Sequence, residues 1–190
     1  MRVHTMTSRI EPLQAPFDSQ VMHDFNVVMP EGMPPLGIFR TVAKNPRVLS
    51  RMVNGGLLDK GSISLAEREL VILKVCGLCK AEYEWGVHVT AFAKKAGFNQ
   101  DQIEDTLNAQ ANTALWSKNE NLIIHMVTQL HYHQQIDDSL WSQLIKVYQE
   151  EQLIELVMLS GLYHAVSFVV NGFNIENESF AAKFPLNKKQ

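Results

Sequence analysis

The feature that most constrains the fold is a long apolar run that begins at a helix-capping motif. Ser64-Leu-Ala-Glu67 has the form of a capping box, in which the serine oxygen accepts from backbone N–H groups and the glutamate reaches back to the cap. From Leu65 the sequence continues to Gly97 without a proline. These signals predict one long helix, or two helices with a break near Lys80.

The rest of the chain also carries helical signals. No stretch of alternating β-branched residues competes with them, so the sequence predicts an all-α bundle of about seven or eight helices around the long motif helix. The further helices are expected over 36–44, over 46–54, from Asn99 to about Ala109, from a second capping box at Ser117 to about His133, from Asp137 or Asp138 onward, and over 150–170.

The chain divides into three parts by composition. Residues 1–34 are polar and dotted with prolines, and we expect them to form an irregular arm that packs on a neighbour. Residues 35–176 carry the helical signals and form the predicted domain. Residues 177–190 are expected to be a C-terminal tail.

Composition excludes several classes of function. Hydrophobic residues make up 46% of the 190 residues and charged residues 19%, which is typical of a globular protein. The formal net charge of −3 gives no reason to expect nucleic acid as a partner. No run approaches the roughly 18 uninterrupted apolar residues of a membrane span, and the N-terminus lacks the apolar core of a signal peptide. We therefore expect a cytoplasmic protein without a membrane partner.

The two cysteines, Cys76 and Cys79, are spaced C-x-x-C. In a reducing cytoplasm such a pair is redox-active, metal-binding or incidental, the last meaning that both are small core residues. The other candidate ligands, His131 and His133, point about 200° apart on one helix and cannot both face one ion. We therefore expect neither a metal nor a cofactor. His164, on the last apolar helix, is interpreted as a core histidine in preference to a pocket group.

On a helical wheel of the motif run, the candidate acid, base and thiol residues fall on about the same half of the helix. Glu84 and His88 are one turn apart, and a carboxylate beside an imidazole orients the ring and raises its pKa, as a general acid or base requires. The alternative is an ordinary ion pair on a solvated helix face. The candidates that share about half of the wheel are Glu69, Cys76, Cys79, Tyr83, Glu84 and His88.

The run LAERELVILKVCGLCKAEYEWGVHVTAFAKKAG resembles the core motif of carboxymuconolactone decarboxylase-like proteins. In the alkylhydroperoxidase D branch, the pattern is Glu, eleven residues, C-x-x-C, three residues, His. Anchored on His88, this pattern matches Glu69 but places its cysteines at Ala81 and Glu84. The decarboxylase branch tends to carry a glutamate four residues before its histidine, as Glu84 stands here. The resemblance covers roughly residues 34–176.

This resemblance implies a homo-oligomer, usually a trimer or hexamer, with a pocket near a subunit contact. The first hypothesis is a decarboxylase-like enzyme that needs no metal or cofactor. In it His88, tuned by Glu84 and assisted by Glu69, moves a proton on a small carboxylate or lactone substrate.

Two alternatives stay open. A thiol peroxidase of peroxiredoxin-type, antioxidant activity would use Cys76 and Cys79 with a dithiol reductant. On one continuous helix Cys79 would lie roughly 13 Å from His88, too far for direct proton transfer. The relay would then have to be Glu69, Tyr83 or a residue of another helix, such as His125 or His164. The third hypothesis is a helical oligomer that binds a small molecule or a partner protein without catalysis.

Overall fold

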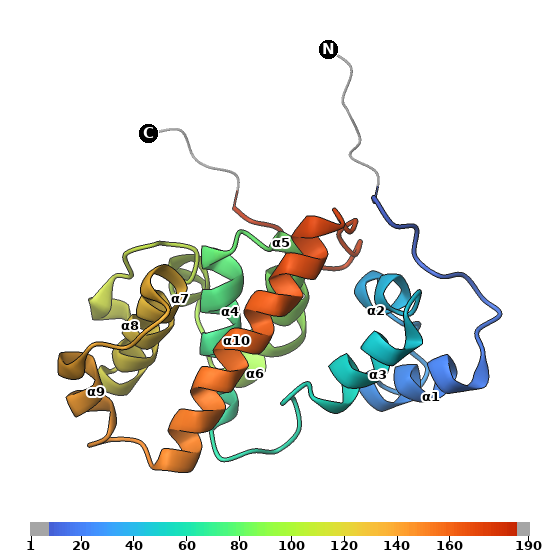
Figure 1. The fold of residues 1–190 in the computed structure, drawn as a ribbon. Helices are drawn as coiled ribbons and strands as arrows, with labels where there is room; N and C mark the ends of the chain where they lie inside the picture. The colour runs from blue at the N-terminus through green and yellow to red at the C-terminus, as the bar shows by residue number, and fades with distance from the viewer. Residues whose placement is uncertain (1–7, 186–190) are drawn as a thin grey trace.

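The computed structural model describes residues 8–185 and confirms the all-α prediction for this part of the chain. Figure 1 shows three helices, α1 to α3, set beside a larger bundle that α10 crosses. The helices are α1 (Ser19–Val28), α2 (Gly37–Val42), α3 (Pro46–Asn54), α4 (Leu65–Leu78), α5 (Glu82–His88), α6 (Lys94–Ala96), α7 (Gln100–Asp105), α8 (Lys118–His133), α9 (Asp138–Leu144) and α10 (Glu150–Gly172), with a π-helical segment at Val89–Ala93 and a 3₁₀ turn at Thr113–Leu115.

The motif region is broken, which settles the alternative that the sequence left open. The capping box at Ser64 opens α4 as predicted, but α4 ends at Leu78 and Lys80 adopts a left-handed conformation, with φ of 54°. A new helix, α5, begins at Glu82, and a π-helical segment follows directly after His88. Because this region yields three helices, the described chain has more helices than the seven or eight expected, and one helical wheel cannot relate residues before Lys80 to residues after it.

The arm contains a helix, so the prediction of an irregular segment over residues 1–34 was wrong within its described part. Asp18 caps α1 by accepting from the backbone N–H of Val21 at 2.8 Å. Val21 and Phe25 lie on one side of α1, are fully or nearly fully buried, and pack α1 against α3. The helix is short and its apolar face holds few residues, so burial against α3 stabilises it more than local propensity does. Residues 1–7 lie outside the described residues.

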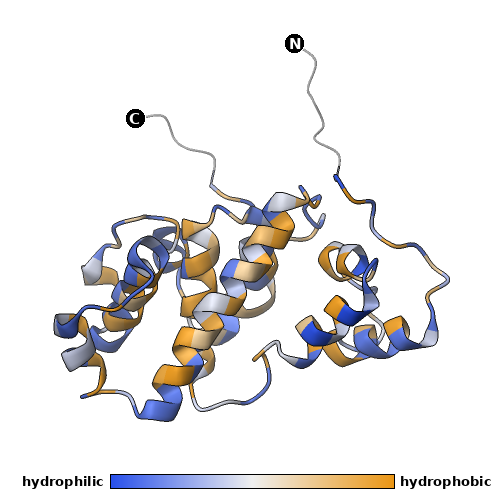
Figure 2. Cartoon of the chain, in the orientation of Figure 1, coloured by the Kyte–Doolittle hydropathy of each residue, from blue (hydrophilic) through white to orange (hydrophobic). Residues whose placement is uncertain are grey.

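The last helix, α10, is the core helix of the bundle. It packs against α4, α5 and α8, and Leu156 and Leu159 are completely buried. By length and composition alone it is also the one helix in residues 8–185 that could cross a membrane, and 44% of its most apolar 18-residue window is buried inside the protein. Figure 2 shows hydrophobic residues along this helix on the side that faces the viewer as well.

The described part of the tail packs on α5. Glu178 accepts from the Tyr83 hydroxyl at 2.7 Å, and Ala182 donates its N–H to the carbonyl of Gly86 at 3.2 Å. A Cβ at position 86 would collide with the Ala182 carbonyl, so only glycine lets the tail approach this closely. The tail therefore covers α5 and helps to fix its position. Residues 186–190 lie outside the described residues.

Candidate functional site

The break at Lys80 brings Glu69 and His88 into direct contact. Glu69 lies on α4 and is completely buried, while His88 is the last residue of α5. Because the chain turns between these helices, α5 packs back against α4. The Glu69 Oε2 atom and the His88 Nδ1 atom are 2.7 Å apart. Two residues separated by nineteen positions thus form the first pair of a buried polar cluster.

The other ring nitrogen of His88 faces two further groups. The Tyr163 hydroxyl, which comes from α10, lies 3.0 Å from Nε2, and Glu84 Oε1 lies 3.4 Å from the same atom. His88, Glu84 and Tyr163 are all at most 9% exposed. Sequence reasoning missed Tyr163, although a tyrosine and a histidine side by side in an otherwise apolar helix were a signal that polar partners lie nearby.

Arg68 places a positive charge next to Glu69, on the carboxylate oxygen that does not contact His88. The guanidinium of Arg68 contacts Glu69 Oε1 through Nε at 3.0 Å and through Nη2 at 2.9 Å. It also donates to the Leu58 carbonyl and lies over the Phe92 ring, 5.4 Å from its centre. Glu69 therefore has one oxygen on Arg68 and the other on His88, which fixes its carboxylate plane and the orientation of the imidazole.

Burial and the contacts within this cluster shift the pKa values of His88 and Tyr163. Burial by itself would lower the pKa of His88, but hydrogen bonds to Glu69 and Glu84 outweigh it and raise this pKa to about 9. Burial, followed by the negative charges of Glu84 and Glu69, raises the pKa of Tyr163 well above its usual range. At neutral pH the site therefore holds a protonated imidazole against a protonated phenol, an arrangement that can donate a proton.

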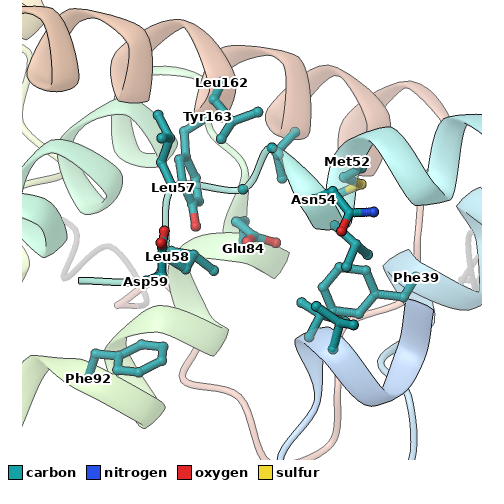
Figure 3. A pocket seen from close by; sticks show the side chains of 16 residues that line it. Phe39, Met52, Asn54, Leu57, Leu58, Asp59, Glu84, Phe92, Leu162 and Tyr163 are labelled. Atoms are coloured by element: carbon teal, nitrogen blue, oxygen red, sulfur yellow. The ribbon is translucent and has the colours of Figure 1, made fainter. Parts of the chain in front are cut away.

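Glu84 and Tyr163 line a cavity of about 700 Å³. Its walls come from two groups of helices. Glu84 and Tyr163 come from α5 and α10, whereas α1, α2, α3 and the segment after α3 supply mostly apolar side chains together with Asn54 and Asp59. Figure 3 shows Glu84 between Tyr163 on one side and Met52, Asn54 and Phe39 on the other. Neither His88 nor Glu69 lines the cavity, so both lie behind the two groups that a ligand would touch.

The structure separates Tyr83 from this cluster. Its hydroxyl donates to Glu178 at 2.7 Å and accepts from the backbone N–H of Ile38 at 3.1 Å. Burial, offset in part by the Ile38 hydrogen bond and reinforced by Glu178, raises the pKa of Tyr83 above its ordinary value. Tyr83 therefore joins α2, α5 and the tail, away from the cavity lining.

The two cysteines lie in different surroundings and are not bonded to each other. Cys76 is completely buried, and burial with the nearby charge of Glu84 raises the pKa of its thiol well above the ordinary value. Cys79 caps the end of α4, is half-buried, and also has a raised pKa because of burial. Neither thiol has the lowered pKa that marks a reactive thiolate.

His131 and His164 form a second polar cluster with Cys79. His131 Nδ1 lies 2.9 Å from His164 Nε2 and 3.9 Å from Cys79 Sγ. His164 is half-buried at the edge of a separate cavity, so its interpretation as a core histidine was wrong: the sequence could not show that α8 places His131 opposite it. Burial, then the neighbouring His164 and Lys74, lowers the pKa of His131. His133 is exposed and takes no part.

The structure thus combines an all-α bundle with a buried Glu–His–Tyr cluster behind a largely apolar cavity. Residues 45–123 match the carboxymuconolactone decarboxylase family, a segment that contains Glu69, Cys76, Cys79, Glu84 and His88. This match bears out the resemblance to carboxymuconolactone decarboxylase-like proteins over the segment that it covers. No curated protein matches the chain significantly.

Solved structures share the fold over 75–94% of the chain. An uncharacterized peroxidase-related protein from Silicibacter sp. TM1040 is 14% identical, with a TM-score of 0.76 over 94% of this chain and 96% of that one. The debrominase Bmp8 in complex with 2,3,4-tribromopyrrole is 18% identical, with a TM-score of 0.68 over 92% and 94%. A peroxidase-related protein with an alkylhydroperoxidase D core, from Ralstonia eutropha JMP134, is 12% identical, with a TM-score of 0.60 over 75% and 76%. At these identities the likeness concerns the fold.

Proposed function

We propose that this protein is an acid–base enzyme of the decarboxylase-like type that moves a proton on a small uncharged substrate such as a lactone. One observation carries the proposal: Glu84 and Tyr163 line the cavity and both contact His88 Nε2. Each group that a substrate would touch is thereby connected to a buried imidazole whose other nitrogen is held by Glu69. A positioned acid or base of this kind typically accelerates a reaction about 10²–10⁴-fold.

The proton moves along a short path. Tyr163 donates its hydroxyl proton to a carbanion or enolate that forms on the substrate, and the phenolate oxygen takes a proton from His88 Nε2 in the same event. His88 becomes neutral while its Nδ1–H stays hydrogen-bonded to Glu69. Glu84, which faces the substrate beside Tyr163, removes the proton that generates the carbanion. Transfer from Glu84 back to His88 Nε2, 3.4 Å away, restores the starting state.

The walls of the cavity favour an uncharged substrate over a carboxylate. The lining includes two acidic side chains, Glu84 and Asp59, and contains no lysine, arginine or histidine. An anionic substrate would meet these like charges directly, whereas the nearest cation described, the imidazolium of His88, lies behind Glu84 and Tyr163 and outside the lining. Arg40, a cation on α2, lines a different cavity near the tail. A lactone or another neutral carbonyl compound meets no such penalty.

The proposal is tested by proton exchange. The protein is incubated in D₂O with a panel of small neutral lactones, and proton NMR follows the loss of C–H signals beside the carbonyl together with ring opening. The same panel includes the corresponding open-chain carboxylates. We expect exchange in the lactones, and we expect Tyr163→Phe, His88→Gln and Glu84→Gln to slow it about 10²–10⁴-fold.

Matched controls come from the same residue types on the surface. His125 and Tyr132 are exposed, so His125→Gln and Tyr132→Phe should leave the exchange rate unchanged. Exchange that proceeds equally in the Tyr163→Phe and His88→Gln variants would refute the proton path, and exchange confined to the carboxylates would refute the choice of substrate class.

The thiol peroxidase hypothesis is less well supported. It needs an accessible thiolate, whereas Cys76 is completely buried and the pKa values of both thiols are raised. The names of the structural neighbours keep it open, because two of them are described as peroxidase-related. A non-catalytic role as a small-molecule binder is distinguished by Glu84→Gln and His88→Gln, which would then leave the biological effect intact.

A further inference from the structure

A second cluster of ligand-type side chains lies on another part of the bundle. Cys79 comes from the end of α4, His131 from α8 and His164 from α10, so three elements converge on one point. Their nearest donor atoms, one sulfur and two ring nitrogens, all lie within 4.8 Å of one another. The proposed acid–base mechanism uses none of them.

The hydrogen bonds orient both imidazoles toward that point. His164 Nδ1 lies 2.8 Å from the carbonyl oxygen of Ser160, and because a carbonyl only accepts, Nδ1 carries the hydrogen. In the neutral ring the lone pair is then on Nε2, which faces His131 Nδ1 at 2.9 Å. A backbone carbonyl that holds the far nitrogen of a histidine is the usual support of a metal-bound imidazole, because it fixes the tautomer and the ring plane.

The donor spacings suit a tetrahedral ion. Zinc binds thiolate at about 2.3 Å and imidazole at about 2.0–2.1 Å, which places neighbouring donors roughly 3.3–3.6 Å apart. The observed separations are 2.9 Å for the two nitrogens and 3.9 Å for His131 Nδ1 and Cys79 Sγ. The donor atoms of the third pair, Cys79 and His164, lie within 4.8 Å of one another. Rotation of side chains that are only half-buried would therefore create three ligand positions.

The fourth position faces open space. The three residues border a cavity of about 420 Å³ whose other walls include Leu130, Val157 and Phe168. Three protein ligands with an accessible fourth position are typical of zinc sites that bind water or a small ligand, whereas structural sites are closed by four protein ligands.

We propose that Cys79, His131 and His164 form a binding site for a zinc-type divalent ion with one open coordination position. One thiolate and two imidazoles are a donor set that zinc and cobalt(II) accept and that magnesium and calcium do not favour. The site differs from the acid–base cavity in its residues and opens on a different surface, although both use α10. The sequence analysis expected no metal, and this proposal departs from that expectation.

Cobalt(II) is the probe that tests the site, because a cobalt–thiolate bond produces a charge-transfer absorption in the near ultraviolet. Metal-stripped full-length protein is titrated with cobalt(II) and then with zinc(II), which should displace it with a stoichiometry of one ion per chain. Cys79→Ser should abolish the charge-transfer band. His131→Gln and His164→Gln should each weaken zinc binding at least about tenfold, since even the loss of a supporting partner of a ligand costs about 10–100-fold.

Two variants serve as matched controls. Cys76→Ala keeps Cys79 and should retain the cobalt–thiolate band, whereas the band would be lost if the C-x-x-C pair itself held the ion. His133→Gln changes an exposed histidine two residues from His131 and should bind normally. Far-ultraviolet circular dichroism establishes that each variant is folded, and zinc should raise the unfolding temperature of the wild type but not of the Cys79→Ser variant. A wild type without the band, or a triple variant Cys79→Ser/His131→Gln/His164→Gln that binds zinc as tightly as wild type, would overturn the proposal.

Discussion

Tyr163 and His164 are neighbours in the sequence, yet their side chains belong to two different clusters. The Tyr163 hydroxyl contacts His88 Nε2 at 3.0 Å, and His164 Nε2 contacts His131 Nδ1 at 2.9 Å. Successive residues of a helix point about 100° apart, so α10 can serve a cavity on one side and a second cluster on another. This arrangement lets each cluster be altered separately, and the following predictions use that separation.

The first prediction concerns stability and pH. The pKa of His88 is raised from 6.5 to about 9, so its contribution to the free energy of unfolding is fully present below pH 6.5 and is lost as the pH rises toward 9. The full contribution is about 3 kcal/mol. In urea unfolding between pH 6.5 and 8, the wild type should lose stability relative to His88→Gln as the pH increases.

The buried Lys74 is a second titrating group above that range. Its pKa is lowered by burial to about 8, so its effect on stability has the opposite sign. The comparison with His88→Gln cancels this effect, because Lys74 is present in both proteins. His125→Gln should keep the wild-type pH dependence, and identical pH profiles for wild type and His88→Gln would contradict the assignment of a raised pKa to His88.

The second prediction concerns thiol reactivity. Because burial raises the pKa of both cysteines, metal-free protein at pH 7 should react with iodoacetamide more slowly than a free cysteine does, and Cys76 should react more slowly than Cys79. The measurement is mass spectrometry of the alkylated protein over time. In the same preparation, organic hydroperoxide with a dithiol reductant should not be consumed faster by wild type than by Cys79→Ser. Turnover that disappears in Cys79→Ser would favour the peroxidase hypothesis instead.

The third prediction concerns the helix of the N-terminal arm. Phe25 is 2% exposed and its ring packs edge-on against Phe17, with the ring centres 5.1 Å apart. Phe25→Ala should lower the free energy of unfolding by about 3–5 kcal/mol, the usual cost of removing a buried phenylalanine. Met22→Ala changes a residue of the same helix that is 40% exposed and should cost much less. Equal effects of the two substitutions would show that α1 does not pack on α3 in solution.

The fourth prediction concerns self-association, which we propose occurs through α10. Its exposed residues Ile154, Met158 and Ala165 recur at helical spacing and form one stripe. An exposed apolar stripe of this kind is typical of a subunit contact. Sedimentation should show a homo-oligomer for the wild type and smaller species for Met158→Glu. Glu151→Lys, a charge change on the exposed first turn of the same helix, should leave the assembly intact, and a monomeric wild type would refute the proposal.

Local signals in the sequence predicted most of the fold. The capping boxes at Ser64 and Ser117 and the proline-free run after Leu65 gave helix starts that the structure confirms. The helix α1 of the arm was not predicted, because its stability comes from burial of Val21 and Phe25 against α3. Such a contact between distant segments leaves no local pattern in the sequence.

The candidate site was predictable only in part. The sequence placed Glu69, Glu84 and His88 on one helical face, but their proximity depends on the turn at Lys80, which a single helical wheel cannot represent. Tyr163 reaches His88 from a helix 75 positions away along the chain. The same holds for His131 and His164, whose contact depends on how α8 packs against α10.

The two walls of the cavity come from different parts of the fold. Under the proposed function, one wall carries the acid–base residues and the other shapes the space for the substrate. Glu84 and Tyr163 stand on helices of the central bundle, whereas much of the opposite wall comes from α1, α3 and the irregular segment at residues 55–59. Segments outside regular helices tolerate exchange more readily than core helices do. Substitutions at positions such as Leu57 and Leu58 would therefore reshape the volume offered to a ligand while the buried Glu69–His88 pair keeps its place. Under the proposed function, substitutions in that one wall would change which substrates fit. The Glu69–His88 pair with Glu84 and Tyr163 would carry out the same proton transfer in each case.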